Sequence, residues 1–441
     1  MIGFFRRLLK DRRGNALAIA CAAMPLVVGC AGLATDTIQW TLWKRQLQRA
    51  ADSAAIAGVY DRVSASGSTS TVSATVTHDL SLNQHTWMGL KSGYPQVTFP
   101  ADSGVSVNQV QVTLAIQQSL PFSSLFVGTA PIITASATAA SVPSAGDACV
   151  QALETNGANW GIRNNGSAGI YMPDCVMYSN SPATNTALAG GNSAVTAQAV
   201  AGVGGIQASN NWNVQAYRPY SPPLADPFAG VTPDPSQEVC STKTVVQGGK
   251  NVTSYYSLDD TTNFSTLPSG TNCFSSLSVG SNRSLTLPDG TYYINGGDVN
   301  IQGNISCSSC TIVLTNYDQS TTATIGSFQS NAGANINLTA PTSGTYKGIA
   351  IYQDRRAIDS GTTDKVNGNN ASIITGALYF PKQQLDYNGT GTTDAQCTMF
   401  VARRVQFTGN NTTTNKFKSL SQCGSAGLPG GGAVRMVRLI A

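Results

Sequence analysis

The chain has 441 residues, of which 11% are charged and 41% hydrophobic, and its formal net charge is only +4. This length predicts two or three domains. The low charge, with Lys and Arg densest before Asp61, argues against a nucleic-acid-binding surface.

The first sixty residues predict a membrane anchor. Five basic residues lie within 1–13, and residues 16–34 then hold no charged or strongly polar side chain. A helix of that length measures roughly 28 Å, close to the hydrocarbon thickness of a bilayer. The positive-inside rule keeps the basic segment in the cytoplasm, so the bulk of the chain is exported. We therefore predict a cytoplasmic segment at 1–13, a transmembrane helix at 14–38 and an Ala-rich helical extension at 39–60.

The helical extension carries one apolar face, which we call the helix seam: Trp40, Trp43, Leu47, Ala50 and Ala54. These residues recur at intervals of three and four, which is typical of one side of a helix. The small side chains would let another helix approach closely. We expect the seam either to pack on the chain's own next domain or to dock other membrane subunits.

Two other interpretations of the N-terminus remain open. The basic start, the apolar middle and a tolerable cleavage site at 32–34 also fit a cleaved secretory signal. The four residues ending at Cys30 resemble the lipobox of a bacterial lipoprotein. The apolar run is longer than an ordinary signal core, and the helical pattern continues to about Tyr60, which favours an uncleaved anchor.

Residues 61–145 predict a small α+β module. A helix is expected over 72–90, followed by an alternating strand over 105–116. A short helix opened by Pro121 and a second strand over 132–139 follow. The composition of 141–146 is that of a linker.

Residues 146–441 predict a mainly β domain. Alternating apolar residues repeatedly end in Gly and then a small polar residue, and these turns recur at a period near twenty, for example at Gly280 and Gly303. Gly and Asn supply the tight or left-handed conformations that such turns need. We expect a right-handed, single-stranded parallel β-helix, with a β-sandwich as the alternative.

Eight cysteines follow the apolar segment, and an even number in an exported region predicts disulfides. Eight cysteines allow 105 connectivities. Among these we favour sequential pairing: Cys149–Cys175, Cys240–Cys273, Cys307–Cys310 and Cys397–Cys423. The Cys307–Cys310 spacing also occurs in redox pairs, but the strand–helix context is lacking, so a static cross-link is expected. A zinc site would need a second close pair or histidines, and His78 and His85 are distant in sequence.

Several short motifs point to one family: RRGN at 12–15, GLA at 32–34 before Asp36, KRQLQ at 44–48 and AADSA at 50–54. With these motifs, residues 12–59 resemble the N-terminal segment of TadG/TadE-like proteins of the tight-adherence (Flp) pilus assembly system. DPFAG at 226–230, GIAIYQDR at 348–355 and TGALYFP at 375–381 are similar to TadG-like proteins with an exported β-rich part. Pilin-like members of this system are cut after a Gly, with Glu at the fifth mature position. A cut after Gly14 would put Ile19 there, so no such cut is expected.

The β-rich region offers few candidates for chemistry. Enzymes on parallel β-helices need clustered carboxylates, and no two acidic residues occupy clearly corresponding positions on adjacent turns. The candidates are Asp259, Asp260, Asp289, Asp298, Asp354, Arg355, Arg356 and Asp386. Tyr292, Tyr293 and Tyr379 could stack on sugars, but tyrosines in strands are more often packed in a core.

The resemblance and the anchor together predict a non-enzymatic, single-pass component of the bacterial inner membrane that acts as a scaffold or docking subunit in Flp pilus assembly. The expected partners are the membrane, pilin-like and other assembly subunits, and the cell wall or the outer-membrane pore; neither a cofactor, a metal nor a nucleic acid is expected. Two alternatives remain: a surface-exposed or lipid-anchored adhesin with a glycan-binding β-helix, and a polysaccharide-degrading enzyme.

Overall fold

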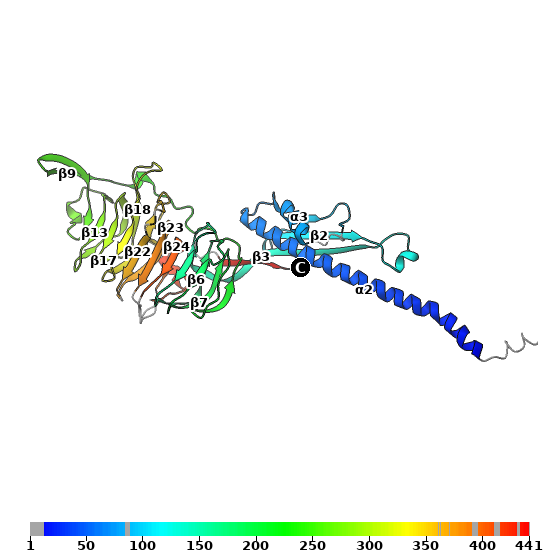
Figure 1. Cartoon of the computed structure of the whole chain (residues 1–441). Helices are drawn as coiled ribbons and strands as arrows, with labels where there is room; N and C mark the ends of the chain where they lie inside the picture. Colours follow the sequence, from blue (N-terminus) through cyan, green and yellow to red (C-terminus); the bar gives the residue numbers. More distant parts are fainter. Residues whose placement is uncertain are drawn as a thin grey trace, which may run out of the picture. The chain divides into compact units, whose positions relative to one another are not determined.

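The computed structural model describes residues 13–83, 89–359, 361, 363–369, 371–389, 396–409, 415–429 and 433–440 (Figure 1). These residues form two units. Unit 1 contains residues 1–142 and 437–441, and unit 2 contains residues 143–436. The last residues therefore belong with the N-terminal part of the chain, although the sequence placed them in a β domain at 146–441.

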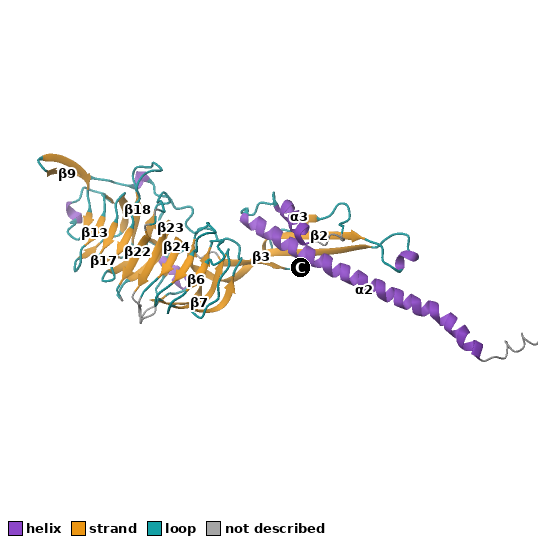
Figure 2. Cartoon of the chain, in the orientation of Figure 1, coloured by secondary structure: helices purple, strands orange, loops and turns teal. Residues whose placement is uncertain are grey.

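Unit 1 is built on one continuous helix, α2 (Arg13–Ser64), which passes through Pro25 without a break. A second helix, α3, extends over Val72–Asn83, within the predicted helix at 72–90. Residues 84–88 of that prediction, including His85, lie outside the described residues. Three strands pair antiparallel in the order β1 (Gln96–Thr98), β2 (Val107–Gln117) and β3 (Ile132–Ala152). The short helix expected after Pro121 is the 3-10 turn η1 (Ser123–Leu125) (Figure 2).

The helix seam forms the core of unit 1. Trp43, Leu47, Ala50 and Ala54 are buried, and they belong to one cluster with apolar residues of α3, β2 and β3. Trp40, in contrast, is 42% exposed. For these four residues the structure shows the first of the two expected alternatives, in which the seam packs on the chain's own next domain. Small side chains are needed here because α3 and the sheet approach α2 closely: a Cβ on Gly58 would lie 2.9 Å from Val110.

Unit 2 consists mainly of short parallel strands. In chain order, its first strands after β3 are β4 (Ile162–Asn164), β5 (Gly169–Ser179), β6 (Ala187–Ala189), β7 (Ala194–Gly202), β8 (Trp212–Arg218), β9 (Thr242–Gln247) and β10 (Lys250–Tyr255). Next come β11 (Leu258–Asp259), β12 (Cys273–Phe274), β13 (Leu277–Val279), β14 (Ser284–Thr286), β15 (Gly290–Asn295), β16 (Val299–Ile301), β17 (Asn304–Cys307) and β18 (Cys310–Thr315).

The remaining strands are β19 (Phe328–Ser330), β20 (Asn335–Thr339), β21 (Ile349–Gln353), β22 (Thr363–Gly368), β23 (Ile373–Gly389), β24 (Thr398–Phe407), β25 (Asn415–Lys416) and β26 (Ala433–Leu439). Short 3-10 turns occur at η2 (Pro235–Gln237), η3 (Phe264–Thr266) and η4 (Leu420–Ala426).

The parallel strands stack into ladders. Ladder 1 runs β12, β15, β18, β21, β23, β24, β3, β5, β7, β8. Ladder 2 runs β11, β13, β16, β19, β22, β23, β24, β4, β6. A third ladder joins β14, β17, β20 and β23. The turns predicted at Gly280 and Gly303 lie where the chain passes from a strand of ladder 2 to a strand of the third ladder, between β13 and β14 and between β16 and β17. Among the described strand pairings of unit 2, the one between β9 and β10 is antiparallel and the others are parallel, whereas a sandwich would require antiparallel hairpins throughout.

Strand order differs from chain order at one junction. The C-terminal strand β24 pairs with β3 and β4, so the first strands of unit 2 stack on its late strands. The chain reaches one end of ladder 1 at β8 and resumes at the other end, at β11 and β12. The segment between must therefore travel back along the ladder, and we call its residues 221–240 the strap.

The strap follows ladder 1 strand by strand. Gln151 of β3 donates hydrogen bonds to the carbonyls of Leu224 (3.0 Å) and Ala225 (2.9 Å). Tyr352 of β21 donates to the carbonyl of Val231 at 2.8 Å. This cover explains why every residue of β18 and β21 is buried, whereas β13 and β16 of ladder 2 alternate buried and exposed positions.

We predict that Ala54→Leu destabilises unit 1 by about 1–3 kcal/mol, because the added atoms must enter a closely packed core. Ala54 is 0% exposed. The matched control is Ala57→Leu, at a half-buried position of the same helix, which is expected to change stability less. Thermal unfolding of the full chain, followed by helical circular dichroism, measures both. Equal melting temperatures for the two variants would contradict the assignment of the seam to this core.

Candidate functional site

The N-terminal half of α2 presents a bare apolar surface. Its large apolar side chains are 55–70% exposed at Ile19, Met24, Leu26, Val27, Val28 and Leu33. By length and composition, α2 can cross a membrane, and its most apolar stretch has a mean hydropathy of 1.5. Along this one helix, the large apolar side chains before Asp36 are exposed, whereas from Trp43 onward the helix seam is buried.

Asp36 marks this change. Its side chain is 3% exposed, and its carboxylate accepts hydrogen bonds from the backbone N–H groups of Phe122 (2.8 Å) and Ser123 (2.5 Å) as well as from the Ser123 hydroxyl. The Phe122 ring lies directly against Gly32. Asp36 therefore satisfies free donors at the start of η1 and fixes the β2–β3 loop to α2.

Further along α2, polar side chains bind the strand that leaves this loop. Gln48 donates to the carbonyl of Ser136 at 2.9 Å, and Lys44 donates to the carbonyl of Thr134. Lys44 and Gln48 lie in the motif KRQLQ. The polar residues of this motif thus hold the sheet of unit 1, while its Leu47 enters the core.

The structure pairs the eight cysteines of unit 2 as Cys149–Cys175, Cys240–Cys273, Cys307–Cys310 and Cys397–Cys423. This is the sequential pairing that we favoured. The first bond joins adjacent strands β3 and β5, and the second fastens the end of the strap to β12. Cys21 and Cys30 are free and exposed on α2.

The three segments DPFAG at 226–230, GIAIYQDR at 348–355 and TGALYFP at 375–381 meet at one cluster, which we call the strap clamp. The Arg355 guanidinium binds the Asp226 carboxylate at 3.0 Å and the carbonyls of Phe228 (2.6 Å) and Val231 (2.8 Å). The Tyr379 hydroxyl donates to Asp226 at 2.7 Å and also contacts Arg355. The Phe228 ring packs edge-on against Tyr379 with ring centroids 5.4 Å apart.

The strap clamp is a structural site. Tyr379 is 0% exposed, and its phenol is held between Arg355 and Asp226, so it cannot stack on a sugar as one sequence hypothesis allowed. Tyr292 and Tyr293 are also buried. The sequence motifs DPFAG, GIAIYQDR and TGALYFP gave the residues of this clamp, but their spacing gave no sign that they meet.

A second buried ion cluster was missed by sequence reasoning. Glu154 binds Arg403 (3.0 Å) and Arg404 (3.1 Å), and both guanidinium groups also bind Asp359. Burial alone would raise the pKa of Glu154, but hydrogen bonds from Asn156, Arg403 and Arg404 hold it below its ordinary value. The cluster links β24 to the loop after β3, where the early and late strands of unit 2 join.

Most of the acidic candidates have structural partners. Asp354 binds Arg356 at 2.7 Å and accepts a hydrogen bond from Thr315. Asp259 accepts from Thr261 in its own turn, and Asp298 accepts from the Ser327 N–H at 2.8 Å. Asp260 pairs with Arg283 at 3.4 Å, and Asp386 accepts from Gln384 at 2.6 Å. Asp289 is exposed beside β15.

Asp364, which sequence reasoning did not single out, lies in the interior of unit 2. It is 0% exposed and accepts hydrogen bonds from the Phe328 N–H (2.7 Å) and from Gln353 (3.2 Å). Burial raises the pKa of Asp364 to about 8, and Asp298 and Asp386 act in the same direction. Since no solvent reaches Asp364, we assign it to an internal polar network with Gln353 and Gln383.

Glu238, Cys240 and Cys273 place their carboxylate and sulfur atoms within 4.8 Å of one another. The two sulfurs are joined in a disulfide, so they cannot serve as thiolate ligands. Burial raises the pKa of Glu238 to about 7, although Arg356 opposes this shift. The group therefore offers one carboxylate and does not form a metal site of the kind that zinc requires.

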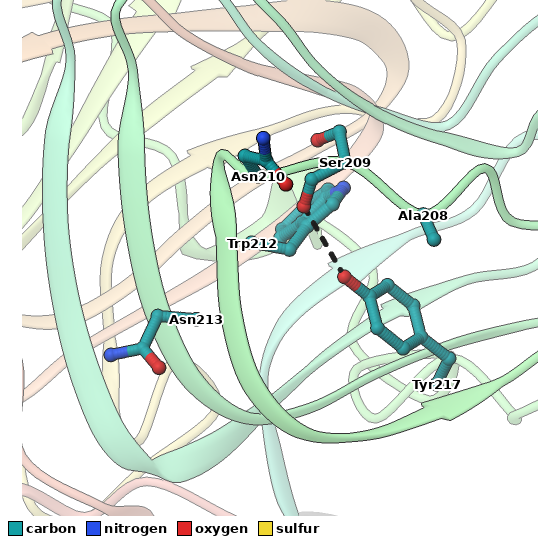
Figure 3. Close-up of a pocket in the computed structure, with 6 residues that line it drawn as sticks. All are labelled: Ala208, Ser209, Asn210, Trp212, Asn213 and Tyr217. Carbon is teal, nitrogen blue, oxygen red and sulfur yellow. Dashed lines mark hydrogen bonds between the residues drawn. The ribbon is translucent and has the colours of Figure 1, made fainter.

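A shallow pocket of about 540 Å³ lies beside β8, at the end of ladder 1 (Figure 3). Its wall combines an indole, a phenol and amide side chains, and it is lined by Ala208, Ser209, Asn210, Trp212, Asn213 and Tyr217. Tyr217 donates to the carbonyl of Ser209 at 3.5 Å. The indole N–H of Trp212 is buried and has no hydrogen-bond partner among the described residues.

Comparison with known families places one match on α2. Residues 14–62 match a family model described as "Putative Flp pilus-assembly TadE/G-like". This confirms the resemblance over the segment that holds both the exposed apolar surface and the helix seam. A search of curated proteins and a search of solved structures each found no match.

We predict that Arg355→Ala loosens the strap and lowers the stability of unit 2 by about 2–3 kcal/mol, because Asp226 and two strap carbonyls lose charge-assisted hydrogen bonds. Limited proteolysis should then cut within 221–240 at least several-fold faster. Arg283→Ala is the control, since the Arg283 side chain is 66% exposed and pairs only at the surface. Unchanged cleavage in the Arg355 variant would contradict the clamp.

A second prediction concerns pH. Because the pKa of Asp364 is raised from 3.8 to about 8 on folding, its contribution to stability is complete below about pH 4 and is lost as the pH rises towards 8. Asp364→Asn should therefore lose less melting temperature than wild type between pH 5 and pH 8. The exposed substitution Asp289→Asn should follow wild type. Parallel pH profiles for the Asp364 variant and wild type would refute the assignment.

Proposed function

We propose that this chain is a single-pass, inner-membrane component of tight-adherence (Flp) pilus assembly, with a scaffold role and no enzymatic activity. The observation that carries this proposal is the coincidence of the Tad match at 14–62 with one helix that is exposed and apolar before Asp36 and has one face packed in unit 1 from Trp43 onward. Residues 1–13 would lie in the cytoplasm by the positive-inside rule, and both units would lie in the periplasm.

The membrane span in this proposal ends at about Thr35. Asp36 accepts hydrogen bonds from the β2–β3 loop, so the contacts between α2 and the rest of unit 1 include polar groups from this position on. The helical extension then acts as a rigid stalk inside unit 1, and the helix seam is its internal packing face. Docking of pilin-like and platform subunits is therefore assigned to the exposed apolar surface of α2 within the bilayer and to the surfaces of the exported units.

The exported unit 2 is proposed to be a right-handed parallel β-helix. Support comes from its three ladders of parallel strands, in which successive members such as β14 and β17 pair twenty residues apart, Ser284 with Asn304. Parallel connections are right-handed in nearly all proteins. Four disulfides favour an oxidising compartment such as the periplasm. An anchored, rigid body of this kind would be held at high local concentration at the assembly site.

The non-enzymatic role is supported by how the acidic residues are used. Asp354, Asp226 and Glu154 are held in ion pairs, and Asp364 is enclosed. In the described residues, His78 belongs to unit 1, whereas these carboxylates belong to unit 2. Cleavage of a glycosidic bond needs two accessible carboxyl groups. We therefore assign structural roles to these ion-paired or enclosed carboxylates.

A second candidate function is a surface adhesin that binds glycans. The pocket beside β8 favours it, because an aromatic ring next to amide side chains is a common arrangement for holding a sugar. The adhesin would have to be released from the membrane or anchored by a lipid. Whether the N-terminus is processed therefore distinguishes the adhesin from the anchored assembly component.

We predict that only the anchored chain supports pilus assembly. In a piliated host from which the gene has been deleted, the full chain is compared with a version whose residues 1–34 are replaced by a cleavable secretion signal. Both must reach equal levels of unit 2 in immunoblots. The full chain should restore surface pilin, and its mass should show an intact N-terminus. Restoration by the cleaved version, or a mature start at Cys30 or near Thr35, would favour the adhesin.

A further inference from the structure

A second apolar surface lies beside the proposed span, at the tip of the β2–β3 loop. Leu125 and Phe126 are each 75% exposed, and Val127 is 55% exposed. Three consecutive large apolar side chains at this exposure are unusual on a surface that faces water. We call residues 125–127 the loop tip; its first residue, Leu125, is the last residue of the short turn η1, which Figure 2 draws in the loop beyond β2.

The loop is held in place rather than free. The Asp36 carboxylate binds two backbone N–H groups and one hydroxyl of Phe122 and Ser123. The Phe122 ring rests on Gly32 and also contacts the Phe126 ring, with centroids 5.2 Å apart. A chain of contacts thus connects the loop tip to the last turn of the apolar surface of α2.

The direction of the loop follows from the contacts of β3. Gln48 binds Ser136, Lys44 binds Thr134, and Asp36 binds Ser123, so the hairpin approaches the N-terminal end of α2 as it nears its tip. Gly32 lies four residues before Asp36, which is about 6 Å along the helix axis. Interfacial anchors bury apolar side chains about 5–10 Å into the headgroup and acyl boundary.

The composition of the hairpin agrees with contact to lipid. From Ser103 to Gly146 the chain contains no charged residue and no histidine. The neighbouring side chains of α2 are also apolar and exposed, with Leu33 at 58% and Ile38 at 62%. The loop tip therefore continues the apolar surface that the proposed function already places in the bilayer.

We infer that the β2–β3 loop is a second membrane contact, in which Leu125, Phe126 and Val127 enter the periplasmic headgroup and acyl boundary beside the span. This inference rests on the proposed membrane span. With two attachment points joined by Asp36, unit 1 cannot rotate freely about the span, because rotation would draw the loop tip out of the lipid.

The test uses the full chain with Cys21→Ser and Cys30→Ser, reconstituted in vesicles of phosphatidylcholine and phosphatidylglycerol. Phe126→Cys, Leu125→Cys, Val28→Cys and Leu82→Cys variants each carry one NBD fluorophore. Val28 reports on the span. Leu82 on α3 is the matched control, since its side chain is 71% exposed. The adjacent residue Asn83 donates to Ser53 at 3.4 Å, which places this control near a part of α2 that is distant from Asp36. The Leu125→Cys variant is included because it keeps the Phe122–Phe126 ring contact, which Phe126→Cys removes.

Brominated acyl chains should quench the probes at Val28, Leu125 and Phe126 several-fold more than the probe at Leu82. Quenching at Val28 with loop probes that behave like Leu82 overturns the loop contact and leaves the span intact. Absence of quenching at Val28 overturns the span itself. A loop probe that is buried but insensitive to bromolipid would show a protein occupant, which also overturns the lipid contact.

Discussion

Unit 2 depends on the return of its chain along ladder 1. The strand β24 stacks on β3 and β4, so early and late strands form continuous ladders. This arrangement leaves the chain at β8, at the wrong end to begin β12, and the strap must cover the distance between them. The strap brings backbone polar groups over buried strands, where each needs a partner. Gln151 and Tyr352, in strands of ladder 1, and Arg355, just after β21, supply such partners, which explains polar and charged side chains at this apolar ladder.

The strap clamp shows how a charge is made tolerable in such a place. Arg355 is only partly exposed, and burial of an unpaired guanidinium would be costly. Its donors are divided between the Asp226 carboxylate and two strap carbonyls, while the Tyr379 hydroxyl completes the shell of Asp226. Because these bonds are directional, they also set the register of the strap on the strands. The Cys240–Cys273 bond then fixes the end of the strap covalently.

Local patterns in the sequence were sufficient for part of this fold. The apolar run and the seam predicted α2, the Gly and Asn turns predicted stacked parallel strands, and order along the chain favoured the disulfide pairs. What local patterns could not supply were partners distant in sequence. Spacing does not reveal that Asp226 meets Tyr379, or that Glu154 meets Arg403 and Arg404. The same limit applies to the seam, since a small apolar face predicts a close neighbour without saying which one.

The burial of the seam changes what α2 can do. The Ala-rich face of α2 is already filled by α3, β2 and β3, so the helix is fixed to unit 1 from Trp43 to Val59. Asp36 adds a polar contact between α2 and the β2–β3 loop, next to the exposed apolar surface. The exposed and packed parts belong to one unbroken helix, so a displacement of the apolar part must move the packed part as well. In the anchored scaffold that we propose, force or orientation at the bilayer would reach the sheet of unit 1 through a stiff element and not through a linker.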